Sequence, residues 1–166
     1  GLIVPSDFQS MGFGVPAAVG AKLGAPGRPV VALVGDGGFL MSGMEVAGAV
    51  REGLSMCFIV FNDGHLNQIR LQQLSQYGRT TGVDLGGVGL QAFADAVGAD
   101  HVAYDPASSP DSTGQVLREG GPTILEVPVG DSPTLGGIVL KRRLKESARS
   151  AIGRGRLSRL KRWLRS

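Results

Sequence analysis

The hydrophobic pattern of the chain alternates between short apolar runs and longer segments of helical spacing. Residues 29–34 (PVVALV) and 55–61 (SMCFIVF) form two nearly continuous apolar runs. Such runs are typical of strands buried on both faces of a parallel sheet. Between them, residues 39–53 carry apolar side chains at helical spacing, so we predict a strand–helix–strand unit.

The same pattern extends the unit in both directions. It predicts helices over 10–23, 66–76, 90–97 and up to about 119, and strands over 101–104 and 122–129. The alternation of strands and helices predicts an α/β fold, a three-layer α/β/α arrangement in which helices cover both faces of a parallel sheet. With 166 residues, 42% of them hydrophobic, the chain suits one domain, which we place at residues 1–130.

Residues 131–166 differ in composition and are predicted to form a basic helical C-terminal tail. Residues 141–166 hold eleven basic residues and one acid, a net charge of +10, whereas the first 140 residues carry −7. Four apolar residues at helical spacing predict a short basic amphipathic helix: Leu157, Leu160, Trp163 and Leu164. Contact with an anionic membrane surface, docking on an acidic protein face and a solvated tail all remain open. We expect no nucleic-acid partner, because only one aromatic residue is interleaved with the charges.

The cellular compartment is predicted from cysteine use and from the apolar runs. The only cysteine, Cys57, lies inside an apolar run, so we expect a buried structural thiol and no internal disulfide. No run approaches the ~20 apolar residues of a membrane span, and no secretory leader pattern is visible. We therefore expect a cytoplasmic protein.

Candidate chemistry follows each of the two apolar runs. The first run leads into residues 35–38 (GDGG) and the second into 62–64 (NDG). Ligands of open parallel sheets bind beyond the carboxyl ends of the strands, so Asp36 and Asp63 are expected to face one site. Mg²⁺ takes one or two carboxylates together with phosphate oxygens. These residues therefore predict a divalent metal site.

The glycines beside Asp36 add a phosphate-binding feature. Gly37 and Gly38 precede a predicted helix, whose N-terminal N–H groups and dipole favour an anion. A dinucleotide fingerprint is excluded because Leu40 stands where its third glycine would fall, and no Gly-Lys-Ser/Thr of a P-loop is present. The pattern indicates a diphosphate bound through a metal, while two ordinary strand–helix turns remain the alternative.

At this point the sequence resembles a known family. The order Gly35-Asp36-Gly37, then Asn62-Asp63 one βαβ unit later, is similar to the signature of thiamine diphosphate enzymes. The stretch MGFGVPAAVGAKLGAPGRPVVALVGDGGF resembles the cofactor diphosphate-binding (PP) domain of the acetolactate synthase, pyruvate oxidase and benzoylformate decarboxylase group. GGVGLQAFADAVGA and GGPTILEVPV resemble its later helix and final strand, so the likeness covers roughly residues 9–129.

The resemblance implies a set of cofactor and metal contacts. Asp36 would supply a Mg²⁺ carboxylate, Asp63 the second side-chain ligand, and the main-chain carbonyl of His65 the third protein ligand. The family usually has Asn where this chain has Asp63, which adds a negative charge beside the diphosphate. The implied cofactor-binding set is Gly35, Asp36, Gly37, Gly38, Asp63, His65, Leu66 and Met11.

Two residues near the N-terminus are implied to act on the cofactor rings. Met11 matches the bulky apolar residue that wedges between the two rings and bends the cofactor, although a plain core methionine remains an alternative. Gln9 stands where the family often has Gly, whose carbonyl accepts a hydrogen bond from the 4′-amino group. Gln keeps that carbonyl but has less backbone freedom. No role is assigned to His101, and the ring of His65 could face substrate or solvent.

The resemblance implies a decarboxylase or carboligase that acts on a 2-oxo acid with thiamine diphosphate and Mg²⁺. The family's chemistry also needs a pyrimidine-binding (Pyr) domain, which we expect from another subunit of a homo- or hetero-oligomer or from a further segment. We therefore predict no turnover by this chain alone. A non-catalytic binding or regulatory module that kept the fold is the alternative.

Overall fold

The computed structural model describes residues 1–6, 8–107 and 120–130. The chain divides into two compact units, which are treated separately. The first comprises Gly1–Leu66 and Asp84–Gly130, and the second Asn67–Val83 together with residues 131–166. The basic tail and the helix expected up to about residue 119 lie outside the described residues, so both stay predictions, as does the boundary at residue 130.

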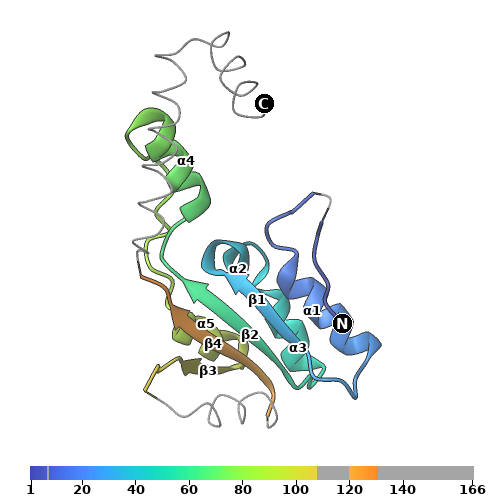
Figure 1. Ribbon diagram of the computed structural model, residues 1–166. Coiled ribbons are helices and arrows are strands. Elements are labelled where there is room, and N and C mark those ends of the chain that lie inside the picture. The colour runs from blue at the N-terminus through green and yellow to red at the C-terminus, as the bar shows by residue number, and fades with distance from the viewer. Residues whose placement is uncertain (7, 108–119, 131–166) are drawn as a thin grey trace, which may run out of the picture. The chain divides into compact units, whose positions relative to one another are not determined.

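Helices and strands alternate along the described chain, as the hydrophobic pattern predicts (Figure 1). In chain order they are α1 (Gly14–Gly24), β1 (Val31–Gly35), α2 (Asp36–Ser42), α3 (Glu45–Arg51), β2 (Met56–Asn62), α4 (Asn67–Tyr77), α5 (Leu90–Val97), β3 (Asp100–Ala103) and β4 (Pro122–Pro128). The four strands form one sheet in the order β1-β2-β4-β3, and every pairing is parallel. The α/β fold with a parallel sheet is thereby confirmed.

The strand register brings the two candidate loops together. Val34 pairs with Val60 and Gly35 with Phe61, so β1 and β2 end at the same edge of the sheet. The two strands are neighbours, which a shared site for Asp36 and Asp63 requires. The turn that follows β1 therefore lies beside the turn that follows β2.

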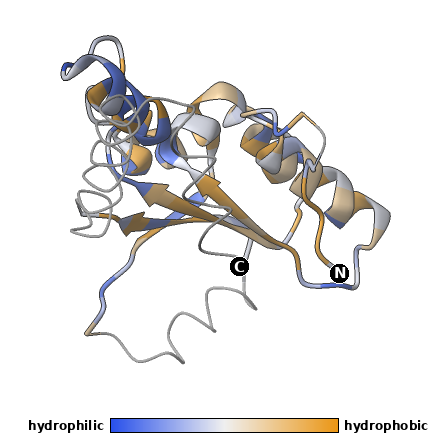
Figure 2. Ribbon diagram, turned by 45° about the horizontal axis from the view of Figure 1, so that its top comes forward, coloured by the Kyte–Doolittle hydropathy of each residue, from blue (hydrophilic) through white to orange (hydrophobic). Residues whose placement is uncertain are grey.

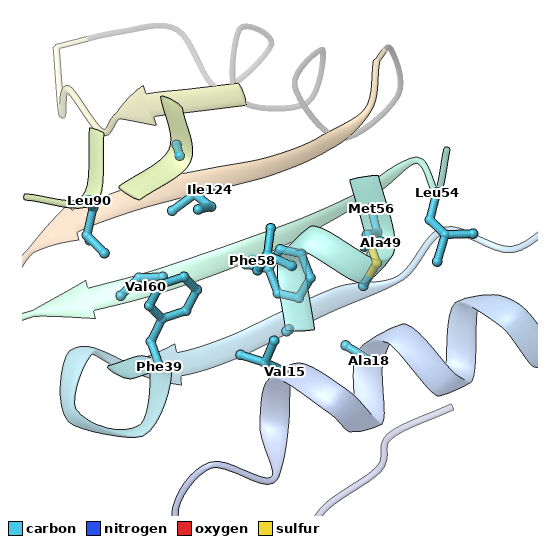
Figure 3. Packing of buried hydrophobic residues seen from close by; sticks show 13 residues of the cluster. Val15, Ala18, Phe39, Ala49, Leu54, Met56, Phe58, Val60, Leu90 and Ile124 are labelled. Carbon is cyan, nitrogen blue, oxygen red and sulfur yellow. The ribbon is translucent and has the colours of Figure 1, made fainter. Parts of the chain in front are cut away.

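The core lies between the sheet and the helices of the first unit (Figure 3). Phe58 and Val60 of β2 and Ile124 of β4 are fully buried against side chains from α1, α2, α3 and α5. Phe39 of α2 meets Phe93 of α5 edge to face, with ring centroids 5.3 Å apart. An aromatic pair of this geometry adds about 1 kcal/mol beyond its buried area. The aromatic pair connects α2, which begins with Asp36, with α5.

The prediction that residues 29–34 are buried on both faces of the sheet is wrong for β1. Ala32 is buried, but Val31 is 42% and Leu33 67% exposed. Side chains alternate between faces along a strand, so these two residues share the face opposite Ala32. Among the described residues β1 is an edge strand, and the core cluster of this unit packs on the Ala32 face. An apolar run cannot distinguish an edge strand from a central one.

The helix expected over residues 39–53 is two helices, α2 and α3, separated at Gly43 and Met44. A Cβ on Gly43 would lie 2.9 Å from the carbonyl oxygen of Phe39, so only glycine fits this close turn. The first helix also begins earlier than predicted, at Asp36 itself. Gly37 and Gly38 therefore lie within its first turn rather than before it.

In the second unit, the described residues form α4 and the loop after it. The Gln73 side chain makes two hydrogen bonds to the backbone of Thr81. Its Nε2 donates to the Thr81 main-chain oxygen at 3.1 Å, and its Oε1 accepts from the Thr81 amide at 2.8 Å. Helix α4 is largely hydrophilic, whereas the strands are mostly hydrophobic (Figure 2). Within the described ranges, no helix is both long and apolar enough to cross a membrane.

Candidate cofactor site

Asp36 is a buried carboxylate that accepts from one backbone N–H group in α2 and one in the turn after β2. It is 4% exposed. Its Oδ1 accepts a hydrogen bond from the Gly37 amide at 2.8 Å, and its Oδ2 accepts one from the Gly64 amide at 2.7 Å. The second bond crosses from α2 to the turn after β2. Asp36 thus joins the two turns that the sequence places at one site.

The turn after β2 is closed by its own side chains. Asp63 Oδ1 accepts from the His65 amide at 3.0 Å, and Nδ1 of His65 lies 2.7 Å from the main-chain oxygen of Asp63. Because a carbonyl only accepts, that ring nitrogen is the donor. Gly64 has φ +72°, which glycine adopts without strain. The His65 ring therefore folds back on its own turn.

Three apolar side chains converge on Gly37. A Cβ added there would lie 2.6 Å from Cδ2 of Leu66, 3.4 Å from Cε of Met11 and 3.6 Å from Cδ1 of Leu85. The structure therefore places Met11 and Leu66, both in the implied cofactor-binding set, against the first turn of α2. Leu85 was not identified from the sequence, because it lies in a glycine-rich loop without periodicity. Its amide donates to the Gly64 carbonyl at 2.9 Å, which brings that loop to the site.

Gln9 and Gly38 complete the positions implied near the site. Gln9 has φ +48° and is the only non-glycine residue with positive φ among the described residues. L side chains rarely adopt this conformation, and it costs about 1 kcal/mol. A family glycine at this position would adopt it without cost. Gly38 lies close to the N-terminal segment, since its Cβ position is 3.9 Å from the Gly12 nitrogen.

A polar network that reaches the end of β2 was not identified from the sequence. Glu126 of β4 connects Asn62, at the end of β2, with His101 of β3. The side chain of His101 is 7% exposed and that of Glu126 is 24% exposed. An acidic residue inside the apolar strand PTILEVPV was the available signal. Its partners depend on strand order, which the sequence alone does not show.

The donor set at Asp36 fits a divalent cation. No basic side chain of the described residues pairs with this buried carboxylate, and two amides alone offset its charge. Each carboxylate oxygen keeps lone-pair capacity for a further partner. Asp63, which directly precedes Gly64, has a second carboxylate whose oxygens suit a hard cation. No cluster of three His, Cys, Asp or Glu side chains suited to a metal occurs in the described ranges, so a carbonyl or phosphate oxygen would complete the coordination.

Cys57 has no part in this chemistry. Burial disfavours its thiolate and raises the pKa of the thiol to about 11, while a backbone hydrogen bond from Leu125 acts weakly the other way. The thiol is therefore inert at neutral pH, as expected of a buried structural cysteine.

A parallel α/β sheet with an acidic turn, a helix start and a second turn at one edge is an arrangement typical of domains that bind a phosphate-bearing cofactor. Residues 1–127 match the family described as thiamine pyrophosphate enzyme, C-terminal TPP-binding domain. The chain belongs to this family. Thiamine pyrophosphate is the cofactor also called thiamine diphosphate.

Similar proteins include acetolactate synthases and a thiamine diphosphate-dependent decarboxylase. The chain is 39% identical over 138 residues to an acetolactate synthase of Bacillus subtilis, covering 81% of this chain and 24% of the relative. It is 35% identical over 139 residues to a catabolic acetolactate synthase of Raoultella terrigena, covering 82% and 25%. A solved thiamine diphosphate-dependent 4-hydroxybenzoylformate decarboxylase of Rhodococcus jostii RHA1 superposes with a TM-score of 0.65 at 30% identity, covering 74% of this chain and 24% of that one. The chain spans about a quarter of the length of these relatives.

Proposed function

We propose that this chain binds the diphosphate of thiamine diphosphate through Mg²⁺, as part of a 2-oxo acid decarboxylase or carboligase of the acetolactate synthase type. The observation that carries the proposal is the hydrogen bond of 2.7 Å from the Gly64 amide to Oδ2 of Asp36. It ties together the two turns whose residues the family resemblance implicates in metal and diphosphate binding.

Each residue has a separate role in the proposed site. Asp36 is the fixed metal ligand, because its carboxylate is already oriented by two amides. Asp63 and the main-chain carbonyl of His65 are the other protein ligands. The amide of Gly38, in the first turn of α2, favours a phosphate oxygen. The Gly37 amide already donates to Oδ1 of Asp36, so a phosphate oxygen would share this donor with the carboxylate.

The residues around Gly37 would orient the rest of the cofactor. Thiamine diphosphate, when bound, supplies a carbon nucleophile and an electron sink for the carbonyl carbon of a 2-oxo acid. Met11 is half exposed and reaches Gly37, so its flexible thioether can pack against an aromatic ring. The main-chain carbonyl of Gln9 would hold the amino group of the cofactor. Leu66 and Leu85 would exclude water on the diphosphate side.

Catalysis would require a Pyr domain, from a second subunit or from a longer form of the protein. Support comes from the relatives, whose chains are about four times as long as the matched part. A non-catalytic module with the same fold is the second candidate. The presence of both Asp36 and Asp63 favours the enzyme component, because the family resemblance implies that both hold the metal.

Calorimetric titration of thiamine diphosphate into the purified chain tests the proposal. Binding is expected with Mg²⁺, and it should disappear with a chelator. Inorganic diphosphate should compete. Binding that is unaffected by the chelator would contradict the metal-bridged site. A candidate Pyr-domain protein, added in a second series, should tighten binding if it completes the pocket.

A further inference from the structure

A chain of side-chain hydrogen bonds crosses the first unit from α5 to the end of β2. Gln91 Oε1 lies 2.8 Å from Nδ1 of His101, and Nε2 of the same ring lies 3.0 Å from Oε2 of Glu126. The other oxygen of Glu126 accepts a bond of 2.7 Å from Nδ2 of Asn62. Glu126 is therefore held at both carboxylate oxygens by side chains from the two neighbouring strands.

The orientation of each group follows from its hydrogen-bonding capacity. Gln91 donates from Nε2 to Oδ1 of Asp95 at 2.9 Å, so its Oε1 is the atom that faces His101. Both nitrogens of the His101 ring then face acceptor oxygens, and a ring nitrogen that carries hydrogen donates to its partner. Glu126 in turn receives N–H groups only. Glu126 lies against the His101 ring at one oxygen and accepts from Asn62 at the other, which fixes the carboxylate in place.

Asn62 connects Glu126 with the candidate site through its side-chain hydrogen bonds. Its Nδ2 is engaged by Glu126, which turns its Oδ1 towards the Gly64 amide at 3.3 Å. The same amide donates to Oδ2 of Asp36 at 2.7 Å. The main-chain oxygen of Asn62 accepts from Val129 at 2.9 Å, which holds the backbone as well. Glu126 of β4 thus contacts the turn after β2 indirectly, through its hydrogen bond to the Asn62 side chain.

The geometry points to Glu126 as a positioning residue for the metal–diphosphate site, acting through Asn62 on the Gly64 amide. The inference rests on the proposed function for the nature of the ligand. Glu126 has no hydrogen bond to Asp36 or Asp63, and its loss removes no implied ligand. Groups that hydrogen-bond directly to a metal ligand typically change affinity by about 10- to 100-fold, and Glu126 is more remote than these. We expect the low end of that range, because the Asp36 bond to Gly64 remains.

Amide hydrogen exchange of the 166-residue chain tests the positioning role without any ligand. Glu126→Ala should raise the exchange rate of the Gly64 amide by about 10-fold relative to that of Phe58 in the core. Leu125→Ala is the matched control, because Leu125 is the buried neighbour on β4 and takes no part in the side-chain network. It should affect both amides in proportion to its loss of stability.

A conservative variant separates orientation from charge. Glu126→Gln can still accept from Asn62 through Oε1 and can donate to the His101 ring through Nε2. It should restore Gly64 protection to within about two-fold of wild type. If Glu126→Ala does not fold, His101→Ala removes one of the groups that fix Glu126 and should raise Gly64 exchange by about three-fold. Equal changes at Gly64 and Phe58 in the tested variant would overturn the inference.

Titration of thiamine diphosphate with Mg²⁺ forms the second arm of the experiment. Glu126→Ala should weaken binding by about 10-fold, while Glu126→Gln and Leu125→Ala stay within about three-fold of wild type. Equal weakening by Glu126→Ala and Leu125→Ala would overturn the positioning role in binding. An absence of binding by the wild-type chain would count against the proposed function, and the exchange comparison would still decide whether Glu126 holds the turn.

Discussion

The two turns at the edge of the sheet are built in different ways. The turn from β1 into α2 is compact, and its carboxylate, Asp36, is 4% exposed with both oxygens bonded to amides. In the turn after β2, Asp63 is half-buried and bonds within its own turn, and Asn62 and Glu126 support it from behind. Asp36 of the first turn is bonded to amides of both turns, whereas the second turn is held by Asp63 within it and, through Asn62, by Glu126 of β4. A substitution should therefore be more severe in the first turn than in the second.

Asp36→Ala should have the largest effect. It leaves the amides of Gly37 and Gly64 without their short bonds, so the free energy of unfolding should fall by about 2 kcal/mol. Metal-dependent binding of thiamine diphosphate should weaken by at least about 100-fold. Urea unfolding and calorimetry measure the two effects. Asp36→Asn is the control for the hydrogen bonds. It should recover most of the stability and little of the binding.

Asp63 offers a milder test of the second turn. Asp63→Ala should weaken Mg²⁺-dependent binding by about 10-fold, because a ligand and the bond to the His65 amide are both lost. Asp63→Asn keeps an oxygen for both partners, and it removes one negative charge beside the diphosphate. It should stay within about three-fold of wild type. If Asp63→Asn binds as weakly as Asp63→Ala, the carboxylate charge rather than the oxygen is what matters.

Gly37→Ala probes the apolar side of the first turn. The new Cβ would lie 2.6 Å from Cδ2 of Leu66, so that side chain must shift, and 3.4 Å from Cε of Met11, which is ordinary van der Waals contact. We expect about five-fold weaker cofactor binding with little change in stability, since Leu66 can move and alanine favours helix. Gly48→Ala in α3 is the matched control. Nothing lies within 4 Å of its Cβ position, so stability should rise by about 0.5–1 kcal/mol with binding unchanged.

Gln9→Gly should have the smallest effect, and it should be favourable. The φ of +48° at Gln9 is strained for an L residue, so glycine should raise the free energy of unfolding by about 0.5 kcal/mol. Thermal unfolding checks this. Gln72→Gly, at an exposed position within α4, should instead lower stability by about 1 kcal/mol. A loss of stability in Gln9→Gly would show that the Gln9 side chain makes compensating contacts.

Much of the fold could be predicted because its signals are local. Residues 90–97 are helical as predicted, and the two apolar runs are neighbouring parallel strands. The exposed face of β1 could not be predicted, because edge position depends on strand order. The break between α2 and α3 depends on a contact of Gly43 with the Phe39 carbonyl oxygen, which composition does not reveal.

The two carboxylates of the candidate site could be predicted from the sequence, whereas the residues that contact their turns could not. Asp36 and Asp63 follow strands directly, so the carboxyl-end rule places them together. Glu126 and His101 are separated from Asn62 by 64 and 39 positions, and only the sheet order β2-β4-β3 brings them into contact. Leu85 comes from a glycine-rich loop without periodicity, and a backbone bond to Gly64 brings it to the site.

Paramagnetic relaxation by Mn²⁺ tests the central claim most directly, namely that the two turns form one metal–diphosphate site. Mn²⁺ is added with thiamine diphosphate to the labelled chain, and the amide resonances are followed. The account predicts that broadening is strongest at the amides of Gly37, Gly64 and His65 and weaker at Val31, at the other end of β1, with no such pattern in Asp36→Ala. Broadening centred on any other part of the chain, or unchanged in Asp36→Ala, would contradict it.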